Sequence, residues 1–139
     1  MYLLDNDIFN LIVIGEANTL RKVQQYATQT LLSSIAAEEL ITGRLSSLSR
    51  ARSPRNSLSL PRAHEDFAQA LEEIRLFPVF VYSPEAHAVY QTFAPATLRI
   101  GAQDCRIAAQ AMAHGMTVIT RNLRDFQAIG APCEDWSAA

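Results

Sequence analysis

The stretch from Gly101 to Phe126, GAQDCRIAAQAMAHGMTVITRNLRDF, limits the folds open to this chain more than any other segment. Its alanine-rich first half predicts a helix from Asp104 to His114, because small apolar residues recur there at helical spacing. Gly115 follows and predicts the end of that helix. Thr117–Ile119 then forms a short apolar run, which is typical of a buried strand. A helix followed by a buried strand favours an α/β fold.

Asp104 stands at the start of this predicted helix, where the free N–H groups and the dipole of the first turn stabilise an anion. Helical spacing places it on one face with an apolar stripe formed by Ile107, Ala108, Ala111 and Met112. A carboxylate that leads an apolar stripe is expected to point towards the interior. Helix capping alone explains a lone Asp at this position, so a chemical role depends on other acids joining it. Cys105, beside the stripe, is expected to be a small core residue.

The rest of the chain alternates between short apolar runs and helical patterns. Further strands are expected at Tyr2–Leu4, Thr30–Ser33 and Val79–Val81, with a last one around Cys133. Further helices are expected at Ile8–Ile14, Thr19–Gln29, Ile35–Leu48 (with Ser34 as its N-cap), Pro61–Leu76 and Pro84–Phe93. With 139 residues and 49% hydrophobic content, this order predicts one α/β domain over residues 1–139. We expect a mostly parallel central sheet flanked by helices.

Three acidic residues that are distant in the sequence stand near the ends of predicted strands or helices. Asp5 follows the first strand, and Asp104 begins the helix before the Thr117–Ile119 strand. Glu39 shares a helix face with Ala36, whereas Glu38 points elsewhere. Parallel strands bring their carboxyl ends to one edge of a sheet, where ligands bind in open α/β folds. If these strands are neighbours, Asp5, Glu39 and Asp104 converge.

Converging carboxylates have a chemical consequence. They repel one another, and some must stay protonated at neutral pH unless a cation is present. Mg²⁺ and Mn²⁺ prefer oxygen ligands and usually keep several waters. Such an ion can activate water and stabilise charge on a phosphodiester during in-line displacement. The acidic cluster therefore favours metal-dependent hydrolysis of a phosphodiester.

Three motifs follow one another along the chain and cover nearly all of it. They are Leu3-Leu4-Asp5-Asn6-Asp7, then Glu39-Leu40-Ile41-Thr42-Gly43, then Asp104-x-x-Ile107-Ala108-Ala109 through Thr120-Arg121-Asn122-x-x-Asp125-Phe126. Together with the closing Glu134-Asp135-Trp136, this series resembles the PIN-domain ribonucleases, and more narrowly the VapC-type toxins of type II toxin–antitoxin pairs. Each motif is weak alone, but their order and spacing in one small domain are fairly specific.

The resemblance implies a toxin that is a Mg²⁺- or Mn²⁺-dependent endoribonuclease and cuts RNA in a single-stranded or loop region. It also implies a homodimer and a small antitoxin protein that blocks the site. On this basis Asp5 and Asp104 would be the principal metal ligands. Glu39 would be the third acid, acting directly or through water. Asn122 falls where the family has a fourth polar or acidic group, and Asp125 stands close by as a further acid.

The first motif departs from the family pattern. A hydroxyl residue commonly follows the first Asp in the family, and Asn6 stands in its place here. Asp7 is either a metal ligand through water or a helix N-cap, and we favour the cap. Arg121 and Arg124, beside the acids, are candidates for substrate contact, whereas His114 is expected to close a helix.

Arginines are concentrated in one segment although the whole chain, with 12 basic and 14 acidic residues, has a net charge of −2. This balance gives no reason to expect a uniformly basic nucleic-acid-binding protein. The segment contains Arg44, Arg50, Arg52, Arg55 and Arg62. Pro54 and several serines predict a loop or helix break over Arg50–Leu60. The segment either contacts RNA phosphates, receives an acidic antitoxin segment, or is simply solvated.

Cysteines, histidines and terminal sequence favour a soluble cytoplasmic protein. Cys105 and Cys133 do not make a disulfide framework, and they form no metal-binding pattern with the scattered histidines. Asp5 and Asp7 interrupt the apolar N-terminus, which argues against a signal peptide. No apolar run approaches membrane-spanning length, so we expect no membrane contact.

Two other enzyme or signalling classes, and one binding class, compete with the nuclease. The Asp5-x-Asp7 pattern also fits phosphatases of the haloacid dehalogenase type, which need a lysine near the phosphate. A receiver-like signalling domain needs a late lysine as well. Lys22 is the only lysine, and it lies in an early polar helix. A non-catalytic PIN-fold module that binds RNA or a partner is the remaining alternative, and a metal titration with an RNA-cleavage assay separates it from the nuclease.

Overall fold

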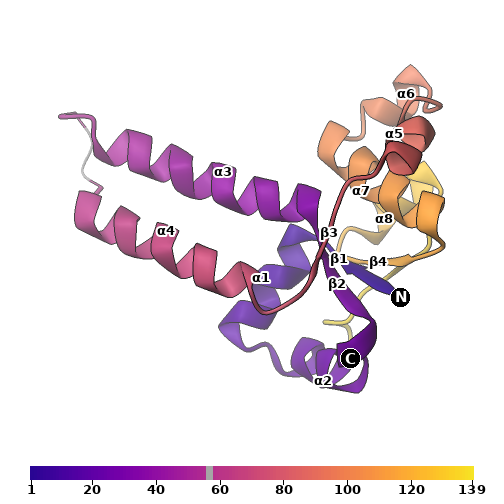
Figure 1. Cartoon of the computed structure of the whole chain (residues 1–139), viewed down its shortest axis with the longest axis horizontal. Coiled ribbons are helices and arrows are strands. Elements are labelled where there is room, and N and C mark those ends of the chain that lie inside the picture. The colour runs from indigo at the N-terminus through magenta and orange to yellow at the C-terminus, as the bar shows by residue number, and fades with distance from the viewer. Residues whose placement is uncertain (56–57) are drawn as a thin grey trace.

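A parallel sheet forms the centre of the molecule (Figure 1). The computed structural model describes residues 1–55 and 58–139. Within them, five strands lie in the order β3 (Val79–Phe80), β2 (Thr30–Ser33), β1 (Tyr2–Leu4), β4 (Thr117–Ile119) and β5 (Cys133–Glu134). Every neighbouring pair is parallel. The predicted α/β fold with a parallel central sheet is confirmed.

Helices connect the strands and flank the sheet. In the described residues they are α1 (Asn6–Ile14), α2 (Ala17–Gln25), the 3-10 helix η1 (Ala27–Gln29), α3 (Ser34–Ala51), α4 (Leu60–Ile74), α5 (Pro84–Tyr90), α6 (Pro95–Leu98), α7 (Ala102–His114) and α8 (Leu123–Ile129). Figure 1 shows α3 and α4 lying side by side as a long hairpin that projects from the body of the domain.

Several element boundaries differ from the predicted ones. Helix α3 continues to Ala51, so the loop predicted over Arg50–Leu60 is shorter, and its residues 56–57 lie outside the described part. The helix predicted over Thr19–Gln29 is divided into α2 and η1. Ser33, rather than Ser34, caps α3, because its hydroxyl accepts the Ile35 N–H. Periodicity places a helix well but does not fix its ends.

The core lies on both faces of the central strands. Leu3 and Leu4 of β1 are fully buried, as are Val118 and Ile119 of β4. Strands that are covered on both faces consist of continuous apolar runs, and this pattern predicts them from the sequence. The apolar stripe of α7 packs into the same core. Its predicted member Met112 is instead 39% exposed, because this residue lies at the edge of the helix face that turns inward.

A buried glutamine ties α7 to the sheet. The Gln110 side chain is fully buried; its Oε1 accepts the Ser33 hydroxyl, and its Nε2 donates to the Phe80 carbonyl over 2.9 Å. Ser33 ends β2 and Phe80 ends β3, so one side chain satisfies polar groups of two strands. Buried polar groups of this kind are costly to leave without partners.

Replacement of this glutamine is therefore expected to weaken the fold. Gln110→Ala removes two hydrogen bonds and leaves a cavity, and we expect a loss of about 2–4 kcal/mol in the free energy of unfolding, measured with urea. Gln127→Ala, at an exposed position of α8, is the matched control and should change it by no more than about 0.5 kcal/mol. Equal effects of the two substitutions would contradict this assignment.

Candidate active site

A polar pocket opens at the carboxyl edge of β1. Its volume is about 330 Å³. The β1–α1 junction, helices α1, α3 and α7, and the loop between β4 and α8 supply its lining residues, which are Asp5, Asn6, Asp7, Asn10, Glu39, Asp104, Ile107 and Asn122. The strand order explains the position, because β1 lies between β2 and β4, and the segments that follow these three strands meet there with the first turn of α7, which precedes β4. Asp5, Glu39 and Asp104 thus share one cavity.

Asp5 is the most deeply buried acid of the pocket, with 6% of its surface exposed. Its backbone N–H extends the β1–β4 pairing by donating to the Ile119 carbonyl. Its Oδ1 accepts the Ile8 N–H over 2.9 Å and so caps α1. The prediction that Asp7 is this cap is wrong. The cap must be the extended residue just before the helix, and α1 begins at Asn6.

Burial raises the pKa of Asp5 to about 6, and the charges of Asp7 and Asp104 add to the rise. Hydrogen bonds from the Ile8 N–H and the Thr120 side chain oppose it. The Thr120 contact was not predicted from the sequence. Its signal is the register: Leu4 pairs with Ile119, so the residues that follow, Asp5 and Thr120, emerge side by side.

Glu39 and Asp104 are both half-buried, on α3 and in the first turn of α7. Burial raises the pKa of Glu39, and the charges of Asp104 and Asp5 raise it further. Burial is also the main cause that raises the pKa of Asp104, followed by the charge of Asp125. The three acids therefore lie close enough for their charges to interact. Glu38 is exposed, as predicted.

Asn122 connects Asp104 to Asp125. Its Nδ2 donates to Asp104 Oδ2 over 3.3 Å and to Asp125 Oδ2 over 2.8 Å. The first of these bonds lowers the pKa of Asp104 and so favours its charged form. Asn122 lines the pocket, whereas Asp125 is outside the lining and reaches the site through Asn122 and through its charge.

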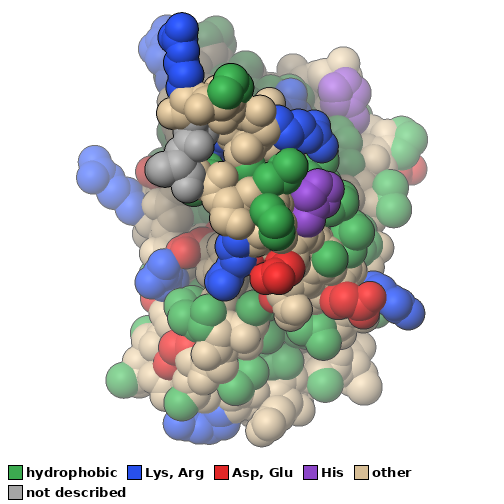
Figure 2. All heavy atoms as spheres, turned by 90° about the vertical axis from the view of Figure 1, so that its left-hand side faces the viewer, with side chains coloured by type: hydrophobic (Ala, Val, Ile, Leu, Met, Phe, Trp, Pro, Cys, Tyr) green, Lys and Arg blue, Asp and Glu red, His purple; other side chains and the backbone are tan. Residues whose placement is uncertain are grey.

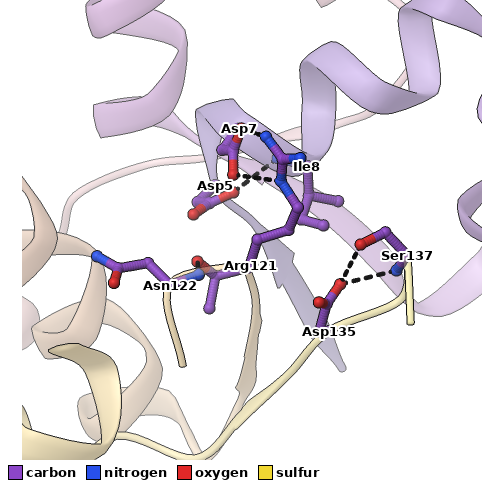
Figure 3. Close-up of polar contacts among 8 residues, drawn as sticks. Asp5, Asp7, Ile8, Arg121, Asn122, Asp135 and Ser137 are labelled. Carbon is purple, nitrogen blue, oxygen red and sulfur yellow. Dashed lines mark hydrogen bonds and ion pairs between the residues drawn. The ribbon is translucent and has the colours of Figure 1, made fainter. Parts of the chain in front are cut away.

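Arg121 and Asp7 form an ion pair at the rim of the pocket. Figure 3 shows Arg121 reaching from the loop after β4 to Asp7, close to Asp5, while Asn122 leaves the same loop in another direction. The Arg121 Nε donates to Asp7 Oδ2 over 2.8 Å, and its Nη2 donates to Asp7 Oδ1 over 2.6 Å.

His114 ends α7, as predicted, and its Nε2 is 2.8 Å from the Ser83 hydroxyl.

The donor set of the pocket suits a hard divalent cation. Carboxylates with raised pKa values share a negative potential that a cation would relieve. The buried Asn6 Oδ1 has no hydrogen-bond partner among the described residues, and Asn6 lines the same pocket. In residues 1–55 and 58–139, no three His, Cys, Asp or Glu side chains are already grouped closely enough to hold a metal ion. Mg²⁺ bound by carboxylates usually keeps several waters.

In the arginine-rich segment, Arg50 lies in the last turn of α3 and Arg62 in the first turn of α4, so both are near the tip of the α3–α4 hairpin, whereas Arg44 is near the middle of α3. Arg62 pairs with Asp66 over 3.2 Å, and Arg50 donates to the Ser47 hydroxyl. Figure 2 views this side of the molecule, and it shows basic and acidic side chains interspersed over it, with several basic ones standing out from the outline. This face therefore carries charges of both signs. Contact of the segment with RNA or an antitoxin stays a prediction.

The PIN domain family matches residues 2–132, so the chain belongs to the PIN domain family. The fold is shared with solved toxin–antitoxin complexes. The DNA-bound VapBC complex from Salmonella typhimurium is similar with a TM-score of 0.75 and 26% identity, covering 97% of both chains. FitAcB from Neisseria gonorrhoeae is similar with a TM-score of 0.72 and 21% identity, covering 100% of both chains. The resemblance to VapC-type toxins is thereby confirmed.

VapBC2 from Rickettsia felis, bound to a promoter DNA fragment, is similar with a TM-score of 0.71 and 20% identity, covering 97% of this chain and 98% of that one. In the comparison with curated proteins, no sequence matches. Among the described helices, none combines the length and the apolar character needed to cross a bilayer.

Proposed function

We propose that this protein is a divalent-metal-dependent endoribonuclease and the toxin of a toxin–antitoxin pair. The observation that supports this most directly is the gathering of Asp5, Glu39 and Asp104 in one pocket of a PIN-family domain. Their raised pKa values are what a cation site is expected to have before the cation arrives. Cation binding would release the protons that these acids retain.

In this proposal Asp5, Glu39 and Asp104 hold Mg²⁺ or Mn²⁺. When bound, such a cation supplies positive charge to the phosphodiester and makes water a better nucleophile. The protein itself orients the acids. Asp5 is fixed by the Ile8 N–H and by Thr120, and Asp104 is held by Asn122. Asp125 in turn accepts from Asn122 and fixes its amide.

The proposal is tested by incubating the purified protein with structured RNA that contains single-stranded loops. We expect cleavage in Mg²⁺ or Mn²⁺ and its loss in EDTA, with recovery when the cation is restored. RNA binding without cleavage under all of these conditions would favour the non-catalytic module instead. Hydrolysis of an aryl phosphate through a phospho-enzyme would favour the phosphatase.

The phosphatase alternative is opposed by the position of its lysine. Lys22 is on α2, and its ammonium lies 5.8 Å from the centre of the Tyr26 ring. Lys22 is also absent from the residues that line the pocket. Asp5 is committed to capping α1 and has 6% of its surface exposed, which does not suit a covalent nucleophile.

An antitoxin is the proposed protein partner, by analogy with the VapBC and FitAcB complexes. A second groove of about 380 Å³ between α1 and α4 suits it, with lining residues Ile12, Val13, Gln69, Glu72, Glu73 and Leu76. Leu76 is 61% exposed there. Its apolar residues and two acids fit an apolar segment with basic residues.

The product of a neighbouring reading frame should abolish cleavage at one equivalent. The homodimer and the cytoplasmic location remain predictions.

A further inference from the structure

The ion pair between Asp7 and Arg121 has a more specific geometry than an exposed ion pair needs in order to stabilise the fold. Their side chains are 45% and 50% exposed, and exposed ion pairs contribute little to folding. Both carboxylate oxygens of Asp7 nevertheless accept from the guanidinium, through Nε and Nη2. The two residues are 114 positions apart and come from α1 and the β4–α8 loop. The contact fixes a long side chain that would otherwise sample many rotamers.

The position of this guanidinium points to a ligand. Asp7 lines the acid pocket, so the group that it holds lies at the mouth of that pocket. The charge of Asp5 also reaches Arg121, where it adds to the larger effect of Asp7 in raising the arginine pKa. A guanidinium has five N–H donors, and two nitrogens face Asp7. The third nitrogen, Nη1, has no hydrogen-bond partner among the described residues.

The electrostatics of the pocket favour a positively charged side chain at its mouth when an anionic substrate approaches. Asp5, Asp7, Glu39 and Asp104 all line the cavity, and their charges would repel an RNA phosphate. The Arg121 guanidinium neutralises the charge of Asp7, and its Nη1 N–H groups can still donate to a phosphate. Arginine forms directional, charge-assisted hydrogen bonds to phosphate oxygens. A preset side chain also loses less entropy when the phosphate binds.

We propose that Arg121, aimed by Asp7, binds a backbone phosphate of the RNA beside the phosphodiester that is cleaved; this inference rests on the nuclease function proposed above. Arg121 is then a substrate-binding residue, and Asp7 is a positioning residue. The rival interpretation is that the pair is a clamp that keeps the loop carrying Asn122 in place.

The two interpretations differ in which kinetic parameter changes. Loss of a phosphate contact weakens RNA binding and leaves the chemical step intact. Loss of a clamp displaces Asn122, and with it Asp104, which lowers kcat and the unfolding temperature. The test compares Arg121→Ala, Arg121→Lys and the control Arg75→Ala. Arg75 is also an exposed, ion-paired arginine, 3.7 Å from Glu72 at the end of α4.

For Arg121→Ala we expect KM for RNA to rise about tenfold, with kcat within about twofold of wild type and an unchanged unfolding temperature. Arg121→Lys should recover part of the loss, because it restores the charge without the two-pronged geometry. Arg75→Ala should leave KM unchanged. A fall in kcat with unchanged KM, or an equal rise in KM in Arg75→Ala, would overturn the proposal.

RNA affinity provides a readout that does not depend on cleavage. Binding of labelled single-stranded RNA is measured in the Asp104→Asn background over a range of salt concentrations. Adding Arg121→Ala should weaken binding and reduce the slope of log K against log salt by about one. Wild-type protein that binds RNA without cutting it would contradict the nuclease, and this affinity comparison would still decide the role of Arg121. Wild-type protein that binds no RNA would overturn both proposals.

Discussion

Asp104→Asn is expected to lower the rate of RNA cleavage by roughly 10²–10⁴-fold while the fold is retained. The substitution removes one of the three charges proposed to hold the cation, whose stabilisation of the transition state amounts to several kcal/mol. The amide has the same size, and its oxygen can still accept from Asn122 Nδ2. Cleavage rates at saturating Mn²⁺ and circular dichroism spectra of the two proteins provide the measurement.

Two further variants calibrate this result. Asp125→Asn should have a smaller effect, because Asp125 reaches the pocket only through Asn122 and through its charge. Asp66→Asn removes an acid from α4 that pairs with Arg62, and it should leave cleavage unchanged. Full activity in purified Asp104→Asn would remove Asp104 from the catalytic site.

Asp5→Asn is expected to stabilise the metal-free protein at pH 7, by up to about 3 kcal/mol. The pKa of Asp5 is about 6 in the folded protein and 3.8 by the reference value, so the folded state binds more protons between these pH values. Loss of the Asp5 proton therefore destabilises the folded state. The Asp5 contribution to the free energy of unfolding is highest below pH 4 and falls as the pH rises through 6. Asn carries no charge and still accepts the Ile8 N–H, so it avoids this loss.

The difference between the two proteins isolates this effect from that of the other acids. Urea unfolding in EDTA is measured across this pH range for wild type and Asp5→Asn. We expect equal stability at the acidic end and a growing advantage for the variant as the pH rises. Adding Mn²⁺ should reverse the order, because the cation stabilises the protein that binds it. Parallel pH profiles would contradict the raised pKa.

The parts of the site predictable from sequence are those set by a single element. A buried strand at Tyr2–Leu4 places Asp5 at its carboxyl end, and the small apolar residues of α7 indicate which side of Asp104 turns inward. The parallel order of the sheet then brings both to one edge. Each inference needs only a local pattern and a general rule of α/β folds.

The parts that could not be predicted depend on pairs of distant residues. No local pattern shows that Asp7 pairs with Arg121, and the same residues are compatible with a helix cap. The bond of Thr120 to Asp5 follows only from the β1–β4 register, which the sequence does not state. The length of α3 was underestimated, because an arginine- and serine-rich end without apolar spacing still continues a helix that packs on α4.

Titration of the metal-free protein with Mn²⁺, followed by calorimetry and by cleavage of the same RNA, tests the central claim most directly. The claim is that the acids of one pocket hold the cation on which cleavage depends. We expect wild-type protein to bind Mn²⁺, cleavage to rise with the same half-saturation, and both to be lost in Asp104→Asn. Cleavage at full rate in EDTA, or equal Mn²⁺ affinity in wild type and Asp104→Asn, would contradict it.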